Sequence, residues 1–269
     1  MQYYFPDQVL LYWNDHNITG MVTVYRRASG IPSTTAFAKL ADRSGFVVNK
    51  DVRVGGATNV FAAFKHSIPY VAKLVCSDEE EDRIDAYLQL DLHHPNIVDM
   101  EILMNRFENG KVLIGMPRMT ASLAETHCRA LALPHITKII ADLLPALKYL
   151  HANGVAHMDM KPANVGIDPQ GNYVLIDLGS AASFSVATSV TTQFLPTEAG
   201  DFGELASDPQ WDFWGLGVML VRLRNSITPR ERPTKDQVYQ FLKDMQVEKK
   251  EALLAELYKS LPEKSVHIK

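Results

Sequence analysis

The residue types with the clearest chemical meaning lie in one short segment, HMDMKPAN, from His157 to Asn164. It holds Asp159, a lysine two residues later at Lys161, and the asparagine at its end. A second aspartate, Asp177, follows a short apolar run. Transfer of a phosphoryl group from a metal-bound nucleotide needs such a set: a carboxylate to orient the attacking hydroxyl, a cation at the phosphate, and oxygen ligands for metal ions. The segment therefore indicates phosphoryl-transfer chemistry.

Strand patterns dominate the elements that precede this segment. Alternating or Val-rich runs between turn residues predict these strands: Phe46–Val54, Val60–Lys65, Tyr70–Val75, Ile97–Leu103 and Lys111–Met116. Ser77 and the four acidic residues after it predict a helix start. Ile84, Leu88 and Leu92 have helical spacing on an apolar face, and Pro95 is expected to end this helix.

Helical periodicity follows in the second half of the chain. Apolar residues recur at helical spacing over Pro134–Ala152, which predicts a long buried helix. A strand-rich part followed by a helical part predicts an α+β protein in two lobes, with a hinge near Pro117–Ala121 and a ligand cleft between the lobes. The expected domains are an N-terminal extension at 1–45, with strands at Gln8–Tyr12 and Met21–Arg26, a first lobe at 46–116 and a second lobe at 117–269.

With these elements in place, the chain resembles the eukaryotic-type protein kinase family over residues 46–220. The similarity lies in Val71-Ala72-Lys73, the His157–Asn164 loop, Ile176-Asp177-Leu178-Gly179, Pro196-Thr197-Glu198, and the Asp212–Gly217 helix start. The resemblance implies a bilobal protein kinase-like fold, with a β-rich N-lobe and a shortened helical C-lobe. It also implies that Asp212 holds the backbone of the catalytic loop.

The resemblance also implies roles for individual residues. Asp159 would be the catalytic base and Lys161 the cation near the γ-phosphate of ATP. Asn164 and Asp177 would be ligands of Mg²⁺. Lys73 would bind the α and β phosphates.

Further nucleotide contacts are implied at Val71, Gly55, Gly56, Met116 and Met119. The acidic partner of Lys73 is expected at Asp85, nine residues before His94, and Glu81 is the rival on the same helix face. The partner expected for Glu198 is an arginine, either Arg230 or Arg232.

Three positions depart from the family pattern. The loop from Gly55 to Val60 lacks the Gly-x-Gly-x-x-Gly arrangement that lets backbone amides approach phosphates. Met158 replaces the usual arginine before the catalytic aspartate, which predicts that phosphorylation within residues 177–198 is not the main switch. Gly166 stands where the family often places a leucine under the adenine ring.

Three functions are consistent with these residues. Lys161, together with Thr191 seven residues before Glu198, favours a protein kinase that phosphorylates serine or threonine. The irregular glycine loop and Asp85 leave open a pseudokinase scaffold that binds nucleotide or a partner without transfer. The shortened C-lobe leaves open a small-molecule kinase.

Composition narrows the classes of partner and location. A formal net charge of -4 argues against a nucleic-acid binder, and the expected partner is a protein substrate. Cys76 and Cys128 lie far apart, which favours a reducing compartment. The N-terminus lacks a signal-peptide pattern. The longest apolar stretch, Phe213–Val221, is about half of the ~20 residues that a membrane span needs. We therefore expect a soluble intracellular protein, cytoplasmic or nuclear, whose oligomeric state the sequence does not define.

Overall fold

The protein divides into two compact units. In the structure, a computed structural model, the described residues are 2–4, 10–12, 46–54, 59–75, 77–104, 112–125, 130–200, 204–225 and 232–259. One unit comprises Met1–Gln89 and Val98–Arg118, and the other comprises Leu90–Ile97 and Met119–Lys269. The change of unit between Arg118 and Met119 falls within the segment Pro117–Ala121.

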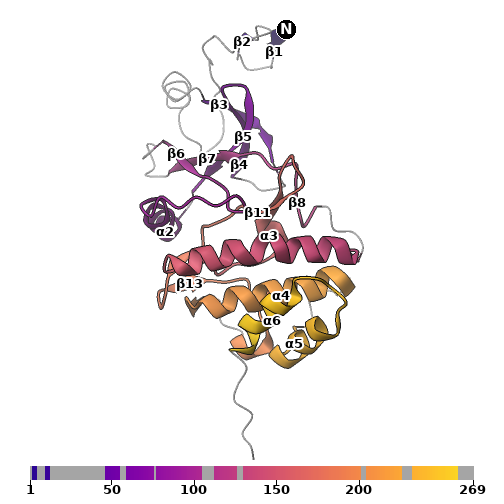
Figure 1. The fold of residues 1–269 in the computed structure, drawn as a ribbon. Helices are drawn as coiled ribbons and strands as arrows, with labels where there is room; N and C mark the ends of the chain where they lie inside the picture. Colours follow the sequence, from indigo (N-terminus) through magenta and orange to yellow (C-terminus); the bar gives the residue numbers. More distant parts are fainter. Residues whose placement is uncertain are drawn as a thin grey trace, which may run out of the picture. The chain divides into compact units, whose positions relative to one another are not determined.

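The first unit is built on a five-stranded antiparallel sheet with the order β3-β4-β5-β7-β6. Its strands are β3 (Phe46–Arg53), β4 (Val60–Lys65), β5 (Ile68–Leu74), β6 (Glu101–Met104) and β7 (Leu113–Pro117), labelled in Figure 1. His66 and Ser67, both with positive φ, form the two-residue turn between β4 and β5, as the twist of a tight hairpin requires. A core of Phe46, Phe61 and neighbouring apolar side chains holds the sheet together.

Helix α2 (Asp78–Leu88) begins where the sequence predicts. The Ser77 hydroxyl accepts a hydrogen bond from the backbone N–H of Glu80 at 3.2 Å, and the first turn is acidic. Ile84 and Tyr87 form its buried face. The helix ends at Leu88, however, well before Pro95, so the prediction that Pro95 ends this helix was wrong.

One other strand prediction needs correction, and another lies outside the described residues. The strand predicted at Ile97–Leu103 begins only at Glu101, because Ile97 instead makes an isolated parallel bridge with Leu175 inside the second unit. Near the N-terminus, β1 (Gln2–Tyr4) pairs antiparallel with β2 (Leu10–Tyr12). The predicted strand Met21–Arg26, together with Cys76 and Cys128, lies outside the described residues.

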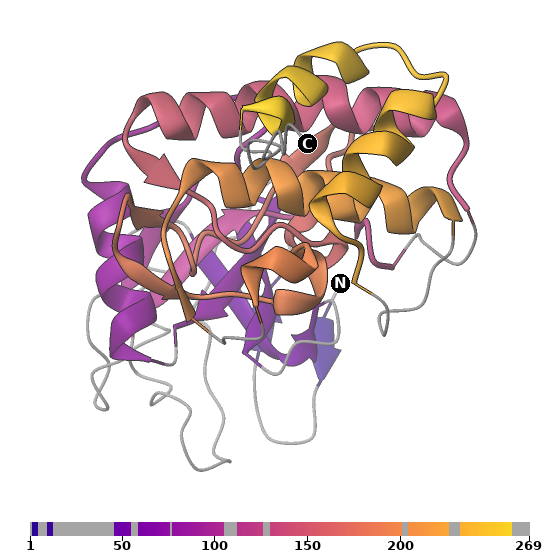
Figure 2. The ribbon, with the colours of Figure 1, turned by 90° about the horizontal axis from the view of Figure 1, so that it is seen from below.

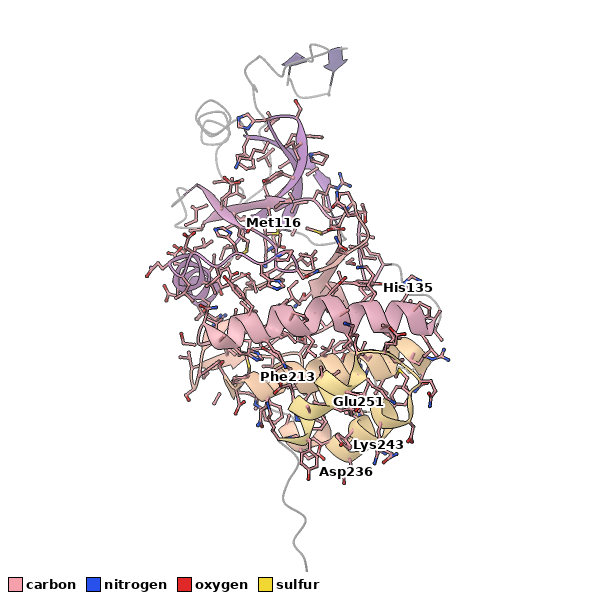
Figure 3. All side chains as sticks on the ribbon, viewed as in Figure 1. Met116, His135, Phe213, Asp236, Lys243 and Glu251 are labelled. Atoms are coloured by element: carbon pink, nitrogen blue, oxygen red, sulfur yellow. The ribbon has the colours of Figure 1, made fainter. Side chains whose placement is uncertain are left out.

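Four helices form the body of the second unit: α3 (Leu133–Ala152), α4 (Pro209–Asn225), α5 (Lys235–Asp244) and α6 (Lys250–Tyr258). Helices α3 and α4 lie side by side in both ribbon views, and α5 and α6 pack on α4 (Figures 1 and 2). Figure 3 labels His135 near one end of α3 and Phe213 on α4. The ring of Phe213 packs edge-on against the ring of His151 on α3. Although α3 has 20 residues, no helix of the described ranges is long and apolar enough to cross a membrane.

Besides its helices, the second unit contains short strands and single 3₁₀ turns. β11, β10 and β8 form a three-stranded sheet in that order, and two further pairs are β12 with β9 and β13 with β14. Their bounds are β8 (Ala121–Ser122), β9 (Val155–Ala156), β10 (Val165–Ile167), β11 (Tyr173–Leu175), β12 (Ala182–Ser183), β13 (Ala187–Ser189) and β14 (Glu204–Ala206). The 3₁₀ turns are η1 (Pro162–Asn164), η2 (Thr192–Phe194) and η3 (Thr197–Ala199).

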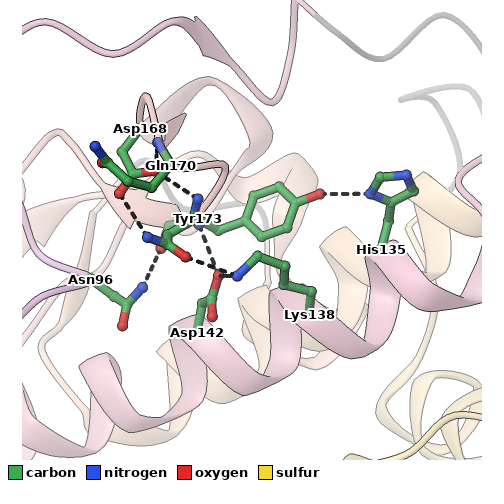
Figure 4. Close-up of polar contacts among 8 residues, drawn as sticks. Asn96, His135, Lys138, Asp142, Asp168, Gln170 and Tyr173 are labelled. Carbon is green, nitrogen blue, oxygen red and sulfur yellow. Dashed lines mark hydrogen bonds and ion pairs between the residues drawn. The ribbon is translucent and has the colours of Figure 1, made fainter.

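A polar network holds the β10–β11 hairpin on α3 (Figure 4). Asp168 closes the turn by accepting a hydrogen bond from the backbone N–H of Asn172 at 2.7 Å. Asp142 of α3 accepts from the backbone N–H of Tyr173 at 2.9 Å, and the Asn96 amide donates to the Tyr173 carbonyl at 2.9 Å. These bonds fix the strand that leads directly to Asp177.

Candidate active site

A buried carboxylate on the first turn of α4 holds the loop that carries Asp159. Asp212 is fully buried and accepts hydrogen bonds from the backbone N–H groups of His157 and Met158, both at 2.7 Å. His151 of α3 is 2.8 Å from the same carboxylate through Nε2. The expectation that Asp212 holds the backbone of this loop is confirmed. Because the backbone N–H groups of His157 and Met158 both donate to Asp212, the conformation of the loop depends on this one side chain.

Met158 fills a packing position in this loop. Its side chain is buried and its backbone is left-handed, with φ of 66°. A residue other than glycine is uncommon in this conformation, and the Asp212 hydrogen bond supports it. Since the Met158 side chain carries no charge, it supplies no cation for a phosphate on the segment 177–198.

Asp159, Lys161, Asn164 and Thr191 meet at the end of the loop. Lys161 Nζ lies 2.6 Å from Asp159 Oδ2 and donates to Thr191 Oγ1 at 3.0 Å. The Asn164 amide nitrogen donates to both the carbonyl and Oδ2 of Asp159, each at 2.8 Å. Asp159 Oδ1 is buried and has no hydrogen-bond partner among the described residues. A buried acceptor without a partner costs stability, so this oxygen is suited to receive a hydroxyl proton from a ligand.

Asn164 and Asp177 lie at the same end of the β10–β11 hairpin. The register pairs Val165 with Leu175, and the backbone N–H of Ile176 donates to the Asn164 carbonyl at 3.0 Å. Both hydrogen bonds of the Asn164 side chain use its nitrogen, so its oxygen faces the other way. One oxygen of Asp177 accepts from the backbone N–H of Gly179 at 3.0 Å.

This donor set fits Mg²⁺ rather than a softer metal. It offers a carboxylate and an amide oxygen, which are hard ligands, and Mg²⁺ commonly binds one or two such groups together with waters and substrate phosphates. No cluster of three or more His, Cys, Asp or Glu side chains able to hold a metal occurs within the described ranges. A cation here would therefore depend on phosphate oxygens to complete its coordination.

In the first unit, Lys73 pairs with Glu80. Lys73 Nζ on β5 is 2.8 Å from Glu80 Oε1, and the two side chains are 13% and 19% exposed. The prediction of Asp85, with Glu81 as its rival, was wrong. Asp85 Oδ1 is buried without a hydrogen-bond partner among the described residues.

The distance of nine residues from His94 does not locate the partner of Lys73, because the segment between α2 and His94 is not helical. Helix α2 ends at Leu88, so the helix must be counted from its own buried face. Glu80 precedes Ile84 by four residues and Tyr87 by seven, which places all three on one side of the helix. This spacing is the signal in the sequence that could have identified Glu80.

The other nucleotide contacts implied by the resemblance are divided between the units. Val71 and Met116 are direct partners in the β5–β7 register and are buried; Figure 3 labels Met116 in the strand-rich unit. Met119 begins the second unit. Gly55 and Gly56 lie outside the described residues.

Met119 explains the glycine at position 166. A Cβ atom added to Gly166 would lie 2.4 Å from Met119 Cγ and 2.7 Å from Ile176 Cγ2. The space that a leucine would use at position 166 is therefore filled by Met119 and Ile176.

Glu198 is bound by the N-terminus of α5. The backbone N–H of Lys235 donates to both carboxylate oxygens of Glu198 at 3.0 Å, where the helix dipole favours an anion. Of the two arginines expected as partners, Arg230 lies outside the described residues, and Arg232 donates to backbone carbonyls of Leu195 and Pro196. The sequence pattern does not mark the backbone of Lys235 as the partner of Glu198.

An antiparallel five-stranded sheet with helix α2, and a helical unit with an Asp–Lys–Asn loop followed by Asp177, are typical of the protein kinase class. The family model described as the protein kinase domain matches residues 46–266. The chain therefore belongs to the protein kinase family, and the predicted family and α+β fold class are confirmed. Protein kinase domains in general use ATP and divalent metal ions.

Curated relatives are similar to part of this chain. Sperm motility kinase Z of Mus musculus is 33% identical over 147 residues, which is 51% of this chain and 29% of that protein. Serine/threonine-protein kinase sck2 of Schizosaccharomyces pombe is 38% identical over 106 residues, covering 37% of this chain and 16% of its own. Serine/threonine-protein kinase VHS1 of Saccharomyces cerevisiae is 25% identical over 221 residues, which is 71% of this chain and 48% of that protein. The matched region spans less than half the length of each of these relatives.

Proposed function

We propose that this chain transfers the γ-phosphoryl group of ATP, with Mg²⁺, to a serine or threonine hydroxyl of a protein substrate. The observation that carries the proposal is the state of the Asp159 carboxylate. Oδ2 is occupied by Lys161 and Asn164, whereas Oδ1 is buried without a partner among the described residues. An unpaired acceptor beside a lysine is what transfer to a hydroxyl requires.

The residues of the loop divide the work of transfer. Asp159 Oδ1 accepts the hydroxyl proton as the acceptor oxygen forms its bond to phosphorus and the bond to the leaving diphosphate breaks. Lys161 neutralises charge on the transferred phosphate and orients Asp159. Asn164 and Asp177 would hold Mg²⁺, which when bound neutralises the phosphate oxygens. Lys73, oriented by Glu80, would bind the α and β phosphates.

Serine or threonine as acceptor is supported by Lys161 and Thr191. Their hydrogen bond at 3.0 Å joins the catalytic loop to the segment before Glu198. The names of the relatives sck2 and VHS1 also describe serine/threonine kinases.

The test is incubation with labelled ATP and Mg²⁺, with myelin basic protein and dephosphorylated casein as acceptors. We expect label on serine or threonine after phosphoamino-acid analysis. Asp177→Ala and Asp159→Ala should each lower transfer at least about 100-fold, because each removes a charge that acts in the transition state. Circular dichroism checks that both variants fold, and Asp236→Ala, on the exposed face of α5, is the matched control.

Three outcomes would contradict the proposal. Equal transfer by wild type and Asp177→Ala would exclude the assigned metal ligand. Binding of ATP in a thermal-shift titration without transfer would favour a pseudokinase scaffold. Label found only on small hydroxyl compounds in a metabolite mixture would favour a small-molecule kinase.

A further inference from the structure

Residues 178–190 join two parts of the candidate active site. They begin after Asp177, the proposed Mg²⁺ ligand, and end before Thr191, whose hydroxyl accepts a hydrogen bond from Lys161 Nζ at 3.0 Å. We name residues 178–190 the joining segment. Because both of its ends lie beside groups that act in transfer, a shift in its middle would move the chain that carries each of them.

The joining segment has no charged side chain with which to form an ion pair. Residues 178–197 contain no Asp, Glu, Lys, Arg or His, and Met158, which precedes Asp159 in the loop, is also uncharged. Hydroxyl side chains are frequent instead: Ser180, Ser183, Ser185, Thr188 and Ser189. The segment is therefore suited to be held by neutral hydrogen bonds and backbone pairing.

Ser207, just before α4, makes three hydrogen bonds to the first half of the joining segment. Its side chain is buried, and Oγ donates to the Ala182 carbonyl at 3.1 Å. Its backbone N–H donates to the Val186 carbonyl at 2.8 Å, and its carbonyl accepts from the backbone N–H of Ser185 at 2.7 Å. Ser185 has a positive φ of 68°, which is uncommon for a residue other than glycine, and the bonds to Ser207 support this turn.

Thr188 supplies a second buried hydroxyl from within the segment. Its side chain is 1% exposed, and Oγ1 donates to the Ser180 carbonyl at 2.8 Å. Its backbone lies in β13, labelled in Figure 1, opposite Leu205 of β14. A buried hydroxyl must bond within the protein, because water does not reach it. The hydroxyls of Thr188 and Ser207 thus fix two carbonyls that follow closely after Asp177.

The chain that carries Ser207 also leads to the residue that holds the Asp159 loop. Asp212, on the first turn of α4, accepts hydrogen bonds from the backbone of His157 and Met158. The joining segment in turn pairs through β12 with β9, which directly precedes His157. The start of α4 therefore supports the Asp159 loop with a carboxylate and the joining segment with a hydroxyl.

We propose that Ser207 and Thr188 are positioning residues, whose two buried hydroxyls hold the joining segment in the conformation for transfer without a phosphate on it. This inference rests on the proposed function and adds to it the groups that place Asp177 and Thr191. Both residues act through the joining segment and not on the reacting atoms.

The first experiment changes the hydroxyl and the shape of Thr188 separately. Thr188→Val keeps the volume and removes the donor, whereas Thr188→Ser keeps the donor and removes a methyl group. Thr188→Val should lower kcat about 3-fold to 10-fold, the equivalent of one neutral hydrogen bond, and Thr188→Ser should stay within about twofold of wild type. The reverse order would show a role in packing alone and overturn the inference.

Ser207→Ala tests the second hydroxyl. It should lower kcat by a similar factor, and Ser207→Ala/Thr188→Val should lower kcat about 10-fold to 100-fold. KM for ATP should change less than about threefold, because Lys73 on β5 is untouched. Ser189→Ala, which removes an exposed hydroxyl on β13, is the matched control and should behave as wild type.

Hydrogen exchange gives a second readout for the same variants. Amides of residues 180–189 should exchange faster in Ser207→Ala than in wild type and Ser189→Ala, because local opening becomes easier. Circular dichroism at the assay temperature checks that each variant is folded. If the double variant fails to fold, the single variants carry the test.

Treatment with a phosphatase separates the two hydroxyls from a phosphate as the means of holding the segment. Treated wild type, with removal of phosphate checked by intact mass, should show the same initial rate of transfer as untreated wild type. A clear fall in the initial rate would mean that a phosphate holds the segment, and the inference would be lost.

Failure of the inference can be told apart from failure of the proposed function. Transfer by wild type with an unchanged kcat in both Thr188→Val and Ser207→Ala overturns the positioning role alone. Unchanged exchange at residues 180–189, or an equal loss of kcat in Ser189→Ala, has the same consequence. If wild type shows no transfer, both proposals are overturned together.

Discussion

The lysine site of the first unit and the aspartate loop of the second unit are held in different ways. In the first unit, Lys73 meets Glu80 because one face of α2 turns toward its partner, so the pairing depends on the rotation of a helix. In the second unit, the loop of Asp159 is fixed by backbone hydrogen bonds to one buried carboxylate, Asp212. The pairing of Lys73 thus depends on which residues one helix face presents, whereas the conformation of the Asp159 loop depends on the acceptor oxygens of a single buried side chain.

The largest effect should follow from removing that carboxylate. Asp212→Ala leaves the backbone N–H groups of His157 and Met158 buried without their acceptor, at about 1–3 kcal/mol each. We expect a loss of about 3–5 kcal/mol in the free energy of unfolding, with loss of transfer. Urea unfolding measures the first and the labelled-ATP assay the second.

The control for this change is Asp236→Ala. Asp236 is exposed in the first turn of α5, where its interaction with the helix dipole contributes about 0.5 kcal/mol. Similar losses for the Asp212 and Asp236 variants would show that Asp212 does not hold the loop. Asp212→Asn should fall between wild type and Asp212→Ala, because one acceptor oxygen remains.

The next effect concerns the choice of acid on α2. Glu80→Gln should lower kcat/KM about 10-fold to 100-fold, because an ion pair between two largely buried side chains loses its charge. Glu81→Gln and Asp85→Asn should change it less than about threefold. Steady-state kinetics with ATP as the varied substrate separate these cases. A larger loss for Asp85→Asn than for Glu80→Gln would restore the assignment made from sequence spacing.

The loop of the second unit could be predicted from sequence because its geometry is local. Asn164, the last residue of the 3₁₀ turn η1, follows Asp159 by five residues, and Asp177 follows Asn164 after a hairpin of fixed register. Residue spacing therefore determines which side chains meet. The same holds for Lys161 and Asp159, which are two residues apart.

The pairing of Lys73 with Glu80 and the contacts of Arg232 do not follow from spacing within one loop. Glu80 can be identified from sequence only once Ile84 and Tyr87 are known to be the buried face of α2. The partner of Lys73 depends on where α2 ends and how it rotates, and a spacing counted from His94 crosses an irregular segment. Arg232 donates to the carbonyls of Leu195 and Pro196, which lie far from it in the sequence, and for this contact the sequence offers only the residue type. The packing of Met119 on Gly166 likewise appears only when β8, β10 and their flanking residues are placed together.

The third substitution tests whether the packing of Met119 against Gly166 stabilises the second unit. Gly166→Leu forces a side chain into the space of Met119, whose Cγ would lie 2.4 Å from the new Cβ. Overpacking of this kind costs about 1–3 kcal/mol, which should lower the unfolding midpoint. The double variant Gly166→Leu/Met119→Ala should recover part of that loss, because the space is vacated. Equal stability of Gly166→Leu and wild type would mean that Met119 moves away without cost.

The smallest effect should come from acidification at His94. Its Nδ1 accepts the backbone N–H of Asn96 at 3.1 Å, and the Asn96 side chain in turn donates to Tyr173 on β11. Burial lowers the pKa of His94 below its ordinary value of 6.5, so the unfolded chain takes up the proton more readily than the folded one.

Stability should therefore fall as the pH decreases through 6.5 toward the lower folded-state pKa of His94, because a protonated Nδ1 cannot accept the Asn96 N–H. His94→Asn supplies a side-chain oxygen that can accept from a residue two positions on, at any pH in this range. Thermal unfolding between about pH 7.5 and about pH 5.5 should show a weaker pH dependence for this variant than for wild type. Identical slopes would place the acid sensitivity elsewhere, and the hydrogen bond from Asn96 would then contribute little to holding β11 before Asp177.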